Sequence, residues 1–292
     1  MNIAINTDFY TSTGDPAPVL RAIAEGGFTH VMWCHQWDTD FLYSQPEWTK
    51  IKKLLKENDL VLQDIHGTAG REKCWYSTDE SERQAGVLLV QNRLEMLQEL
   101  EAIGCLTMHG PFFPANQPEK RENIARQFDQ VRKSLDELMP ILQRYGRLIA
   151  VENLIGDSWE LLEKLLTEYP AEHLGITYDA GHSNIALRPG REFFIKWKDR
   201  VKALHLHDND TQDDQHQPPF YGTVDWDDLT RILASSTYSN PLTFEIGMRC
   251  TPFVHTEAPR NPPQANVMQF MTDAYERCVR VHKFFEFYRK QK

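Results

Sequence analysis

The sequence has no apolar run long enough to cross a membrane. Its longest uninterrupted runs, such as GVLLV at 86–90, have about five residues, whereas a bilayer span needs roughly twenty. The first ten residues, MNIAINTDFY, also lack the basic and apolar segments of a signal peptide. We therefore expect no membrane association and a cytoplasmic location.

The cysteines show no pairing pattern. They are odd in number, widely scattered and never spaced as CxxC: Cys34, Cys74, Cys105, Cys250 and Cys278. A disulfide framework or a thiolate zinc site needs closer, paired spacings. Reduced thiols, which are typical of the cytoplasm, are the expected state.

The chain has fewer basic than acidic residues. The chain has 32 Lys and Arg against 42 Asp and Glu, a formal net charge of −10, and no Lys/Arg run. A protein that grips a nucleic-acid backbone needs a basic surface to displace counterions, so the composition argues against a nucleic-acid partner. No linker rich in Pro, Gly or Ser interrupts the chain, and we expect a single domain over residues 1–292.

Short apolar runs alternate with longer amphipathic stretches throughout the chain. The predicted strands cover residues 2–8, 28–34, 60–66, 105–110, 148–153, 174–179, 201–207 and 241–247. Strand–helix alternation predicts a parallel sheet covered by helices. This number of repeats in a chain of this length predicts a closed (β/α)8 TIM barrel, of the α/β class. A doubly wound open sheet is the alternative.

Six predicted strands carry a titratable side chain near their carboxyl end: His66, His109, Glu152, Asp179, His205 and Glu245. The residue two before each is small or polar, and the residue directly before each is large and mostly apolar. Side chains alternate faces along a strand, so all six groups share the face that suits a crowded barrel interior. The same alternation predicts that Val201, Ala203 and His207 face the interior with His205.

A TIM barrel builds its active site at the carboxyl ends of its strands, where these histidines and carboxylates should meet. Imidazole and carboxylate ligands suit a divalent metal ion, and Mn2+, Zn2+, Co2+ and Mg2+ all stay open. One histidine at a strand end is more often structural, but six groups of matched parity favour a metal site. Trp33, Trp37, Trp75 and Trp226 are expected to pack in the core or at the rim, with a wall for a sugar ring as the alternative.

Several motifs resemble those of the xylose isomerase-like TIM-barrel superfamily. They are VENL with Glu152, TYDAGHSN with Asp179 and His182, KALHLHDND with His205, and TFEIG with Glu245. The superfamily includes sugar phosphate isomerases/epimerases, ketose 3-epimerases, inosose dehydratase and endonuclease IV. The resemblance implies one divalent metal ion held by Glu152, Asp179, His205 and Glu245, with His182 facing a sugar or polyol substrate. It also leaves a homo-oligomer open.

The resemblance extends to a second metal pattern. Endonuclease IV uses nine ligands for three zinc ions, and the matching residues here are His66, His109, Glu152, Asp179, His182, His205, Asp214, His216 and Glu245. The loop 208–216 is acidic, which favours a small-molecule enzyme over one that grips DNA. Two positions that contact sugar in ketose 3-epimerases also differ, since Ser158 replaces an acidic residue and Thr211 a basic one.

The expected activity is that of a metal-dependent isomerase or epimerase acting on a ketose, sugar phosphate or related polyol. Glu152 and Glu245 would serve as base and acid around a metal-stabilised enediolate. The remaining pocket residues would bind substrate or further metal: His66, His109, His182, His207, Asp214 and His216. Dehydratase chemistry, a trinuclear zinc phosphodiesterase and a non-catalytic binding barrel are the alternatives.

Overall fold

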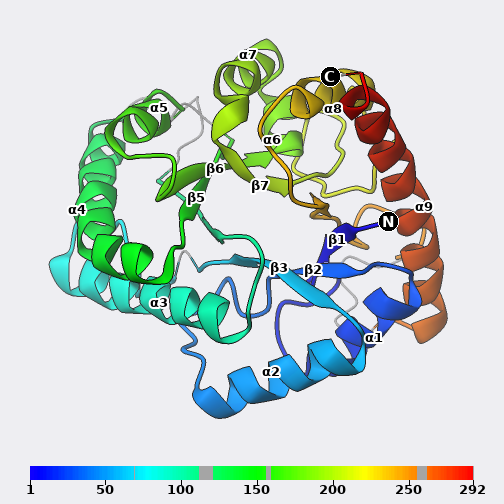
Figure 1. Cartoon of the computed structure of the whole chain (residues 1–292), viewed down its shortest axis with the longest axis horizontal. Helices are drawn as coiled ribbons and strands as arrows, with labels where there is room; N and C mark the ends of the chain where they lie inside the picture. Colours follow the sequence, from blue (N-terminus) through cyan, green and yellow to red (C-terminus); the bar gives the residue numbers. More distant parts are fainter. Residues whose placement is uncertain (69, 112–120, 156–158, 255–261, 292) are drawn as a thin grey trace.

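Eight parallel strands form one sheet that curves into a barrel in the computed structural model (Figure 1). Residues 1–68, 70–111, 121–155, 159–254 and 262–291 are described. The strands are β1 (Ile3–Asn6), β2 (His30–Trp33), β3 (Val61–His66), β4 (Leu106–Met108), β5 (Ile149–Glu152), β6 (Leu174–Asp179), β7 (Val201–His205) and β8 (Leu242–Phe244). The order is β7-β6-β5-β4-β3-β2-β1-β8, and a bridge between Leu206 and Phe244 joins the two edges. The predicted (β/α)8 barrel is confirmed.

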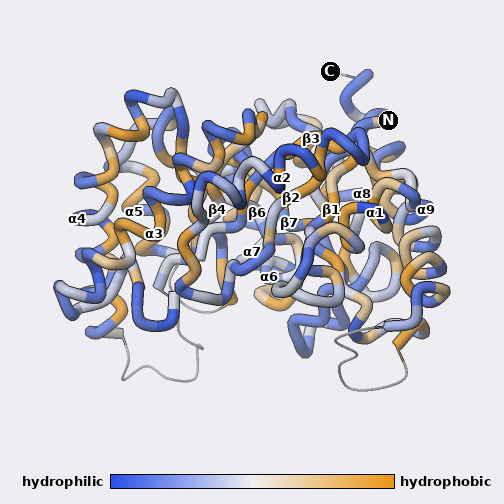
Figure 2. Tube along the Cα trace, turned by 90° about the horizontal axis from the view of Figure 1, so that it is seen from below, coloured by the Kyte–Doolittle hydropathy of each residue, from blue (hydrophilic) through white to orange (hydrophobic). Residues whose placement is uncertain are grey.

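Helices surround the strands and cover the outside of the barrel (Figure 1). They are α1 (Ala17–Glu25), α2 (Gln45–Glu57), α3 (Glu80–Glu99), α4 (Arg121–Tyr145), α5 (Trp159–Glu168), α6 (Ala180–Ile185), α7 (Arg188–Trp197), α8 (Trp226–Ala234) and α9 (Gln264–Arg289). Figure 2 shows hydrophilic and hydrophobic residues alternating along α4 and α9, as expected for helices with one face on a core. In the described ranges, no helix is long and apolar enough to span a bilayer.

Acidic and polar side chains fix where several helices begin. Asp79 precedes α3 and accepts from the backbone N–H groups of Ser81 and Glu82 at 2.9 and 3.1 Å. Asp225 does the same for α8, accepting from Asp228 N at 3.0 Å. These bonds satisfy amides that have no partner inside the helix.

The strand residues divide between two environments, as the alternation of side chains requires. The large residues that directly precede the six titratable groups all belong to the main apolar core, in the layer between strands and helices. Ala150 and Ala203 form a separate small cluster with Cys105 inside the barrel. The Thr107 and Thr177 hydroxyl oxygens lie 2.8 Å apart and are fully buried. Small and polar side chains therefore fill the barrel interior beneath the rim.

One detail of the predicted alternation is wrong. Val201 pairs with Ile176 and packs in the main apolar core, whereas Ala203 pairs with the next residue, Thr177. Lys202 is thus an extra residue in β7, and a bulge of this kind reverses the facing of residues before it. The alternation holds only from Ala203 onward.

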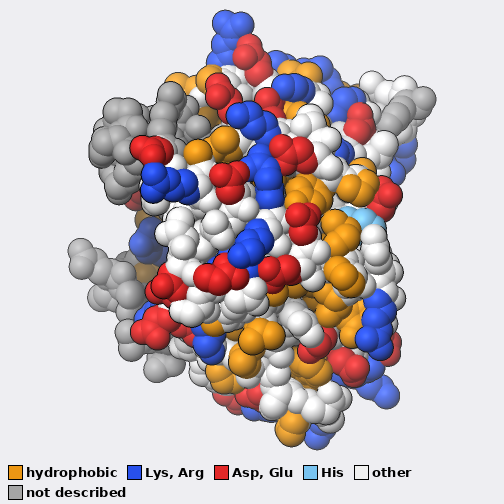
Figure 3. Space-filling view, turned by 90° about the vertical axis from the view of Figure 1, so that its left-hand side faces the viewer, with side chains coloured by type: hydrophobic (Ala, Val, Ile, Leu, Met, Phe, Trp, Pro, Cys, Tyr) orange, Lys and Arg blue, Asp and Glu red, His pale blue; other side chains and the backbone are white. Residues whose placement is uncertain are grey.

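Ion pairs join neighbouring helices on the flank that contains α3, α4 and α5. Arg132 of α4 contacts Glu168 of α5 at 2.5 Å, and Lys133 contacts Glu80 of α3 at 2.7 Å. Figure 3 shows Lys and Arg interspersed with Asp and Glu on this flank, with no large patch of one sign. Each exposed pair stabilises the fold little, at most about 1 kcal/mol.

The loop between β3 and α3 is anchored against α3 and α4. The buried Arg83 donates to Ser134 at 2.8 Å, and the Ser134 hydroxyl donates to the carbonyl of Trp75 at 2.6 Å. The Trp75 indole N–H in turn donates to the carbonyl of His109 at 3.0 Å. These bonds therefore hold the segment that carries His109. The close approach of the loop to α3 depends on Gly86, which has no side chain and lies against the backbone of Cys74 and Trp75.

We predict that Gly86→Ala destabilises the protein. Helix propensity alone would favour Ala by about 1 kcal/mol. A Cβ atom at Gly86 would instead lie 2.3 Å from Trp75 N and 2.4 Å from Cys74 C, both backbone atoms. We expect the free energy of unfolding in urea to fall by about 2 kcal/mol or more. Leu88→Ala, at an exposed site of the same helix, is the control, and a stabilised Gly86→Ala variant would contradict the prediction.

Candidate metal centre

The titratable groups predicted at the strand ends meet at the carboxyl end of the barrel. His66, Glu152, Asp179 and His205 are the last residues of β3, β5, β6 and β7. His109 and Glu245 directly follow β4 and β8. All six strands run in one direction, so these side chains arrive at the same rim.

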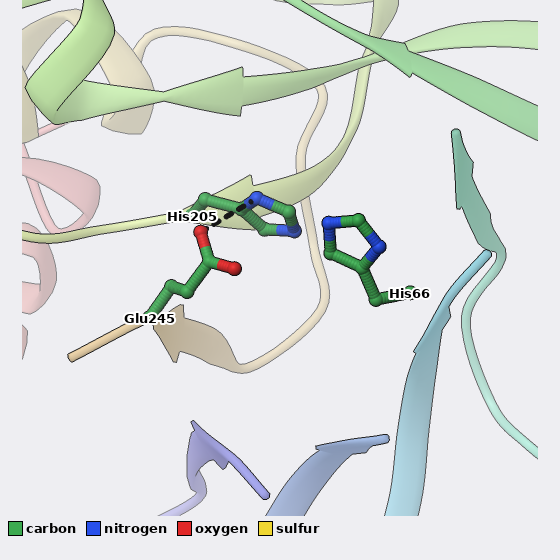
Figure 4. Close-up of side chains that lie close together, drawn as sticks. All are labelled: His66, His205 and Glu245. Carbon is green, nitrogen blue, oxygen red and sulfur yellow. Dashed lines mark ion pairs between the residues drawn. The ribbon is translucent and has the colours of Figure 1, made fainter. Parts of the chain in front are cut away.

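Glu152, His205 and Glu245 form the centre of the site. His205 Nδ1 lies 3.0 Å from Glu152 Oε2 and 2.9 Å from Glu245 Oε2. Ligand atoms of Glu152, Asp179 and His205 all lie within 4.8 Å of one another, and so do those of His66, His205 and Glu245. Figure 4 shows the last three pointing toward one another from β3, β7 and the end of β8.

These atoms approach one another as ion pairs, but not in hydrogen-bonding geometry. Neither ring nitrogen of His205 has a hydrogen bond within the described part of the chain, and neither does Glu152 Oε2, although all three atoms are buried. A buried polar atom without a partner is costly, so such atoms seldom persist without a ligand. Nitrogen and carboxylate donors turned toward a common space fit a divalent cation.

His66 and His109 lie on one side of the centre, here called the first flank, and both face Glu152. Their Nε2 atoms lie 3.9 and 3.4 Å from Glu152 Oε2. His66 Nδ1 lies 2.8 Å from the carbonyl of Gly67, which fixes Nδ1 as the N–H and leaves Nε2 free to accept or to bind metal. Burial, with the neighbouring His109 and His205, lowers the pKa of His66 to about 4, so this ring is neutral at pH 7.

The second flank consists of His182, His207, Asp214 and His216. His182 Nδ1 lies 3.1 Å from Glu152 Oε1, and its Nε2 lies 3.4 Å from Asp214 Oδ2. His216 Nε2 is 3.1 Å from the same Asp214 oxygen. Ligand atoms of His207, Asp214 and His216 lie within 4.8 Å of one another. All the site residues predicted from sequence therefore lie in one continuous network.

His207, predicted to face the barrel interior and to bind substrate or further metal, lies in direct contact with the carboxylate of Asp179. Its Nε2 lies 3.1 Å from both carboxylate oxygens of Asp179, and its ring stacks on His216 with centroids 4.2 Å apart. Asp179 also accepts from the backbone N–H of His182 at 2.6 Å. His207 thus links the central carboxylates to the second flank.

Histidines balance the negative charge of the carboxylates in the site. Burial acts to raise the pKa of Glu152, but His205 and His109 outweigh it and hold that pKa well below its usual range. Burial acts to lower the pKa of His205, but Glu245 and Glu152 raise it well above its usual value. The ionised form of Glu152 is therefore favoured where positive charge lies beside it, and either protons on histidine or a metal ion can supply that charge.

The sequence analysis missed Asp8, which brings β1 into the site. Its carboxylate accepts from Asn6 Nδ2 at 2.7 Å and from Trp37 Nε1 at 2.9 Å. Burial and then the charge of Glu245 raise the pKa of Asp8 to about 6. The signal was present in the sequence, because Asp8 ends the first predicted strand and shares parity with the small or polar residues Ala4 and Asn6.

Trp37 lies against the histidines, not in the apolar core. Its ring centroid is 4.9 Å from that of His66 and 5.6 Å from that of His109. The other tryptophans considered from sequence, Trp33, Trp75 and Trp226, are buried. Of the two positions that depart from the 3-epimerase pattern, Ser158 lies outside the described residues, and Thr211 adopts a positive φ of 72° in the loop after β7.

Asp208 organises the loop that carries Asp214 and His216. The carboxylate is fully buried and accepts from the backbone N–H groups of Phe220 and Val224 at 2.8 and 3.0 Å. It also accepts from the indole N–H of Trp226 at 3.0 Å. One side chain therefore ties both ends of the loop to the start of α8.

We predict that Asp208→Ala lowers the free energy of unfolding by about 3 kcal/mol or more, because it leaves several buried donors without an acceptor. Urea denaturation followed by circular dichroism measures the change. Asp210→Ala, at an exposed position of the same loop, should change stability by less than about 1 kcal/mol. Equal effects of the two substitutions would show that Asp208 does not have this role.

Comparison with known proteins identifies the family to which this barrel belongs. The model of the family described as "Xylose isomerase-like TIM barrel" matches residues 20–274, and the chain belongs to this family. Uncharacterized protein y4fM of Sinorhizobium fredii is 27% identical over 252 residues, which cover 78% of this chain and 80% of that protein.

Solved structures with the same fold include sugar epimerases. The 3-keto-D-glucoside 4-epimerase YcjR of E. coli superposes with a TM-score of 0.72 at 20% identity, over 96% of this chain and 100% of that one. A D-tagatose 3-epimerase-like protein gives 0.71 at 18% identity, over 100% and 99%. An L-ribulose 3-epimerase gives 0.72 at 13% identity, over 100% and 97%. At these identities the likeness establishes the shared fold.

Proposed function

We propose that the protein is a divalent-metal-dependent isomerase or epimerase acting on a ketose or a related polyol. The observation that carries the proposal is the convergence of two buried carboxylates from non-adjacent strands on one histidine. Glu152 ends β5, Glu245 follows β8, and both lie within 3.0 Å of His205 Nδ1. The family and the epimerases among the solved structures of the same fold support this reading.

Glu152, Asp179, His205 and Glu245 would hold the metal ion. Their fit rests on the unpartnered buried atoms of Glu152 and His205 and on the oxygen and nitrogen donors they offer. When bound, a divalent ion supplies Lewis-acid stabilisation of the negative charge that develops on substrate oxygens.

The two glutamates would move the proton. One carboxylate would remove the proton next to the substrate carbonyl and leave an enediolate. The other would carry a proton before this step and deliver it to the opposite face, which gives an epimer and exchanges the proton states of the two groups in each turnover. Return of the proton to the neighbouring carbon gives an aldose–ketose isomer, and loss of a β-hydroxyl gives a dehydratase product. His182, which lies beside both Glu152 and Asp214, would hydrogen-bond a substrate oxygen.

A trinuclear zinc phosphodiesterase is the second candidate, and one observation favours it. His66, His109 and Glu152 form a compact donor group beside the centre, and Asp214 with His216 forms part of another. Against it stand the formal net charge of −10 and the exposed Asp210 and Asp213 in the loop after β7, which would repel a DNA backbone.

Metal content and product analysis separate these candidates. About one Mn, Co or Mg ion per chain, with turnover of D-psicose, D-tagatose, L-ribulose or a 3-keto-D-glucoside, supports the isomerase or epimerase. Three zinc ions per chain with cleavage of abasic-site DNA would replace it with the phosphodiesterase. A dehydrated product would assign the same proton removal to a lyase. No bound metal, and no change in stability on chelation, would indicate a non-catalytic barrel.

We predict that Glu152→Gln and Glu245→Gln each abolish turnover while the fold is retained. Each substitution removes a carboxylate that accepts a proton, and general acid–base groups typically contribute about 10²- to 10⁴-fold to the rate. Sugar turnover with circular dichroism measures both properties. Glu160→Gln, an exposed substitution on α5, is the matched control. Near-normal activity of either active-site variant on a proven substrate would refute the two-carboxylate proposal.

We also predict that a divalent ion stabilises the protein and that a chelator reverses the effect. Binding to the folded state at about 100 times the dissociation constant adds about 2.7 kcal/mol to the free energy of unfolding. Thermal unfolding with Mn2+, Co2+, Mg2+ or Zn2+ measures it. His205→Ala should abolish the shift, whereas His282→Ala, on α9, should keep it. An unchanged shift in His205→Ala would place the bound ion elsewhere.

A further inference from the structure

Asp8 is held in a fixed position at the rim between β8 and β2. Asn6 Oδ1 accepts from the backbone N–H of Ile246 at 2.9 Å, so the amide N–H2 of Asn6 faces Asp8 and donates to Oδ1 at 2.7 Å. On the other side, Trp37 Nε1 donates to Oδ2 at 2.9 Å. The bonds come from two different strand ends and fix both carboxylate oxygens.

The protein leaves part of this carboxylate free for a ligand. Each ionised carboxylate oxygen can accept two hydrogen bonds. Each Asp8 oxygen receives one, from the side chains of Asn6 and Trp37, and the buried Cys34 thiol is a further partner, which still leaves one position for a ligand. Asp8 is only partly buried, and among the described residues it belongs to none of the groups whose donors converge as metal ligands. It is therefore a polar group at the rim that belongs to none of the candidate metal-ligand groups in the described residues.

The surroundings of Asp8 are acidic and lack basic side chains as partners. In the described part of the chain, the ion pairs of Glu152, Asp179, Asp214 and Glu245 are all with histidines. Asp8 interacts electrostatically with Glu245, which raises its pKa, and with His216, which lowers it, and it has no Lys or Arg partner among those residues. A phosphate, with about −1.5 to −2 charges at pH 7, would face the carboxylates of Asp8 and Glu245 at this position, with no Lys or Arg among the described residues paired to them.

Trp37 gives the same corner an apolar surface. Its ring packs beside His66 and His109, and its N–H is bonded to Asp8. An aromatic ring next to a hydrogen-bond acceptor offers a surface for C–H groups and a partner for a hydroxyl. The two groups together match the alternating C–H and O–H groups of a sugar.

We propose that Asp8 is a specificity-determining residue: its carboxylate accepts a hydrogen bond from a substrate hydroxyl and selects a neutral sugar or polyol over the corresponding phosphate ester. This inference rests on the proposed sugar isomerase or epimerase function and narrows its substrate class. A hydroxyl donating to an ionised carboxylate makes one of the stronger hydrogen bonds in proteins, whereas a phosphate has mainly acceptor oxygens to offer.

The test compares metal-loaded wild type with Asp8→Asn. Calorimetric titration with D-fructose and with D-fructose 6-phosphate gives binding, and turnover of D-psicose, D-tagatose and L-ribulose gives kcat and KM. We expect wild type to bind D-fructose more tightly than its phosphate. In Asp8→Asn, we expect Kd and KM for the neutral sugars to rise about tenfold, with kcat changed by less than about threefold. The ratio of the Kd for D-fructose 6-phosphate to the Kd for D-fructose should be smaller in Asp8→Asn than in wild type.

Two further variants separate a specific role from a structural one. Asp38→Asn removes the same charge from the neighbouring loop, where Asp38 accepts from Ser12 at 3.2 Å, and should bind both ligands as wild type does. Trp37→Phe keeps the aromatic ring but removes the N–H that orients Asp8, and should weaken D-fructose binding in the same direction. Metal content and unfolding temperature should match wild type in all three variants.

The outcomes distinguish this inference from the proposed function. Sugar turnover with an unchanged KM in Asp8→Asn, or tighter wild-type binding of the phosphate, overturns the role of Asp8 and leaves the function standing. Asp8-dependent binding of D-fructose without any turnover keeps the role and overturns the function. Absence of any binding of the neutral sugars by the metal-loaded protein overturns both.

Discussion

The carboxylate of Glu152 is the group on which the rest of the site depends. Its Oε2 atom faces His66, His109 and His205, and its Oε1 atom faces His182, so both flanks of the site meet at this one side chain. It is also buried, and an ionised carboxylate away from water is costly unless positive charge lies close to it. The surrounding histidines supply part of that charge, and the proposed cation would supply the rest.

The barrel supplies the rigidity that such a centre needs. Asn153, directly after Glu152, accepts from Asp179 N at 2.8 Å and donates to Asp179 O at 3.0 Å, which locks the ends of β5 and β6 together. Asp208 fixes the loop that carries Asp214 and His216 in a comparable way. Side chains held by such outer bonds keep their orientation, which is what a metal site at this position would require.

Much of this arrangement could be predicted from the sequence, because two simple rules act on it. Alternation along a strand assigned Glu152, Asp179 and His205 to one face, and the closed barrel brings such faces to one rim. The rules fail where local geometry departs from them, as at the Lys202 bulge that turns Val201 outward. Contacts such as that of His207 with Asp179 depend on how separate strands are placed in three dimensions, which no local pattern encodes.

In the proposed mechanism, different residues would carry the chemistry and the specificity of the site. Proton removal between Glu152 and Glu245 is the same first step for an epimerase, an isomerase and a dehydratase, so the central residues alone do not select among them. The product depends on which carbon and which face are offered to the second carboxylate. In the proposed mechanism, that orientation would be set where the substrate meets the rim, by groups such as His182, Trp37 and Asp8. Changes confined to the rim can therefore redirect the reaction while the centre stays intact.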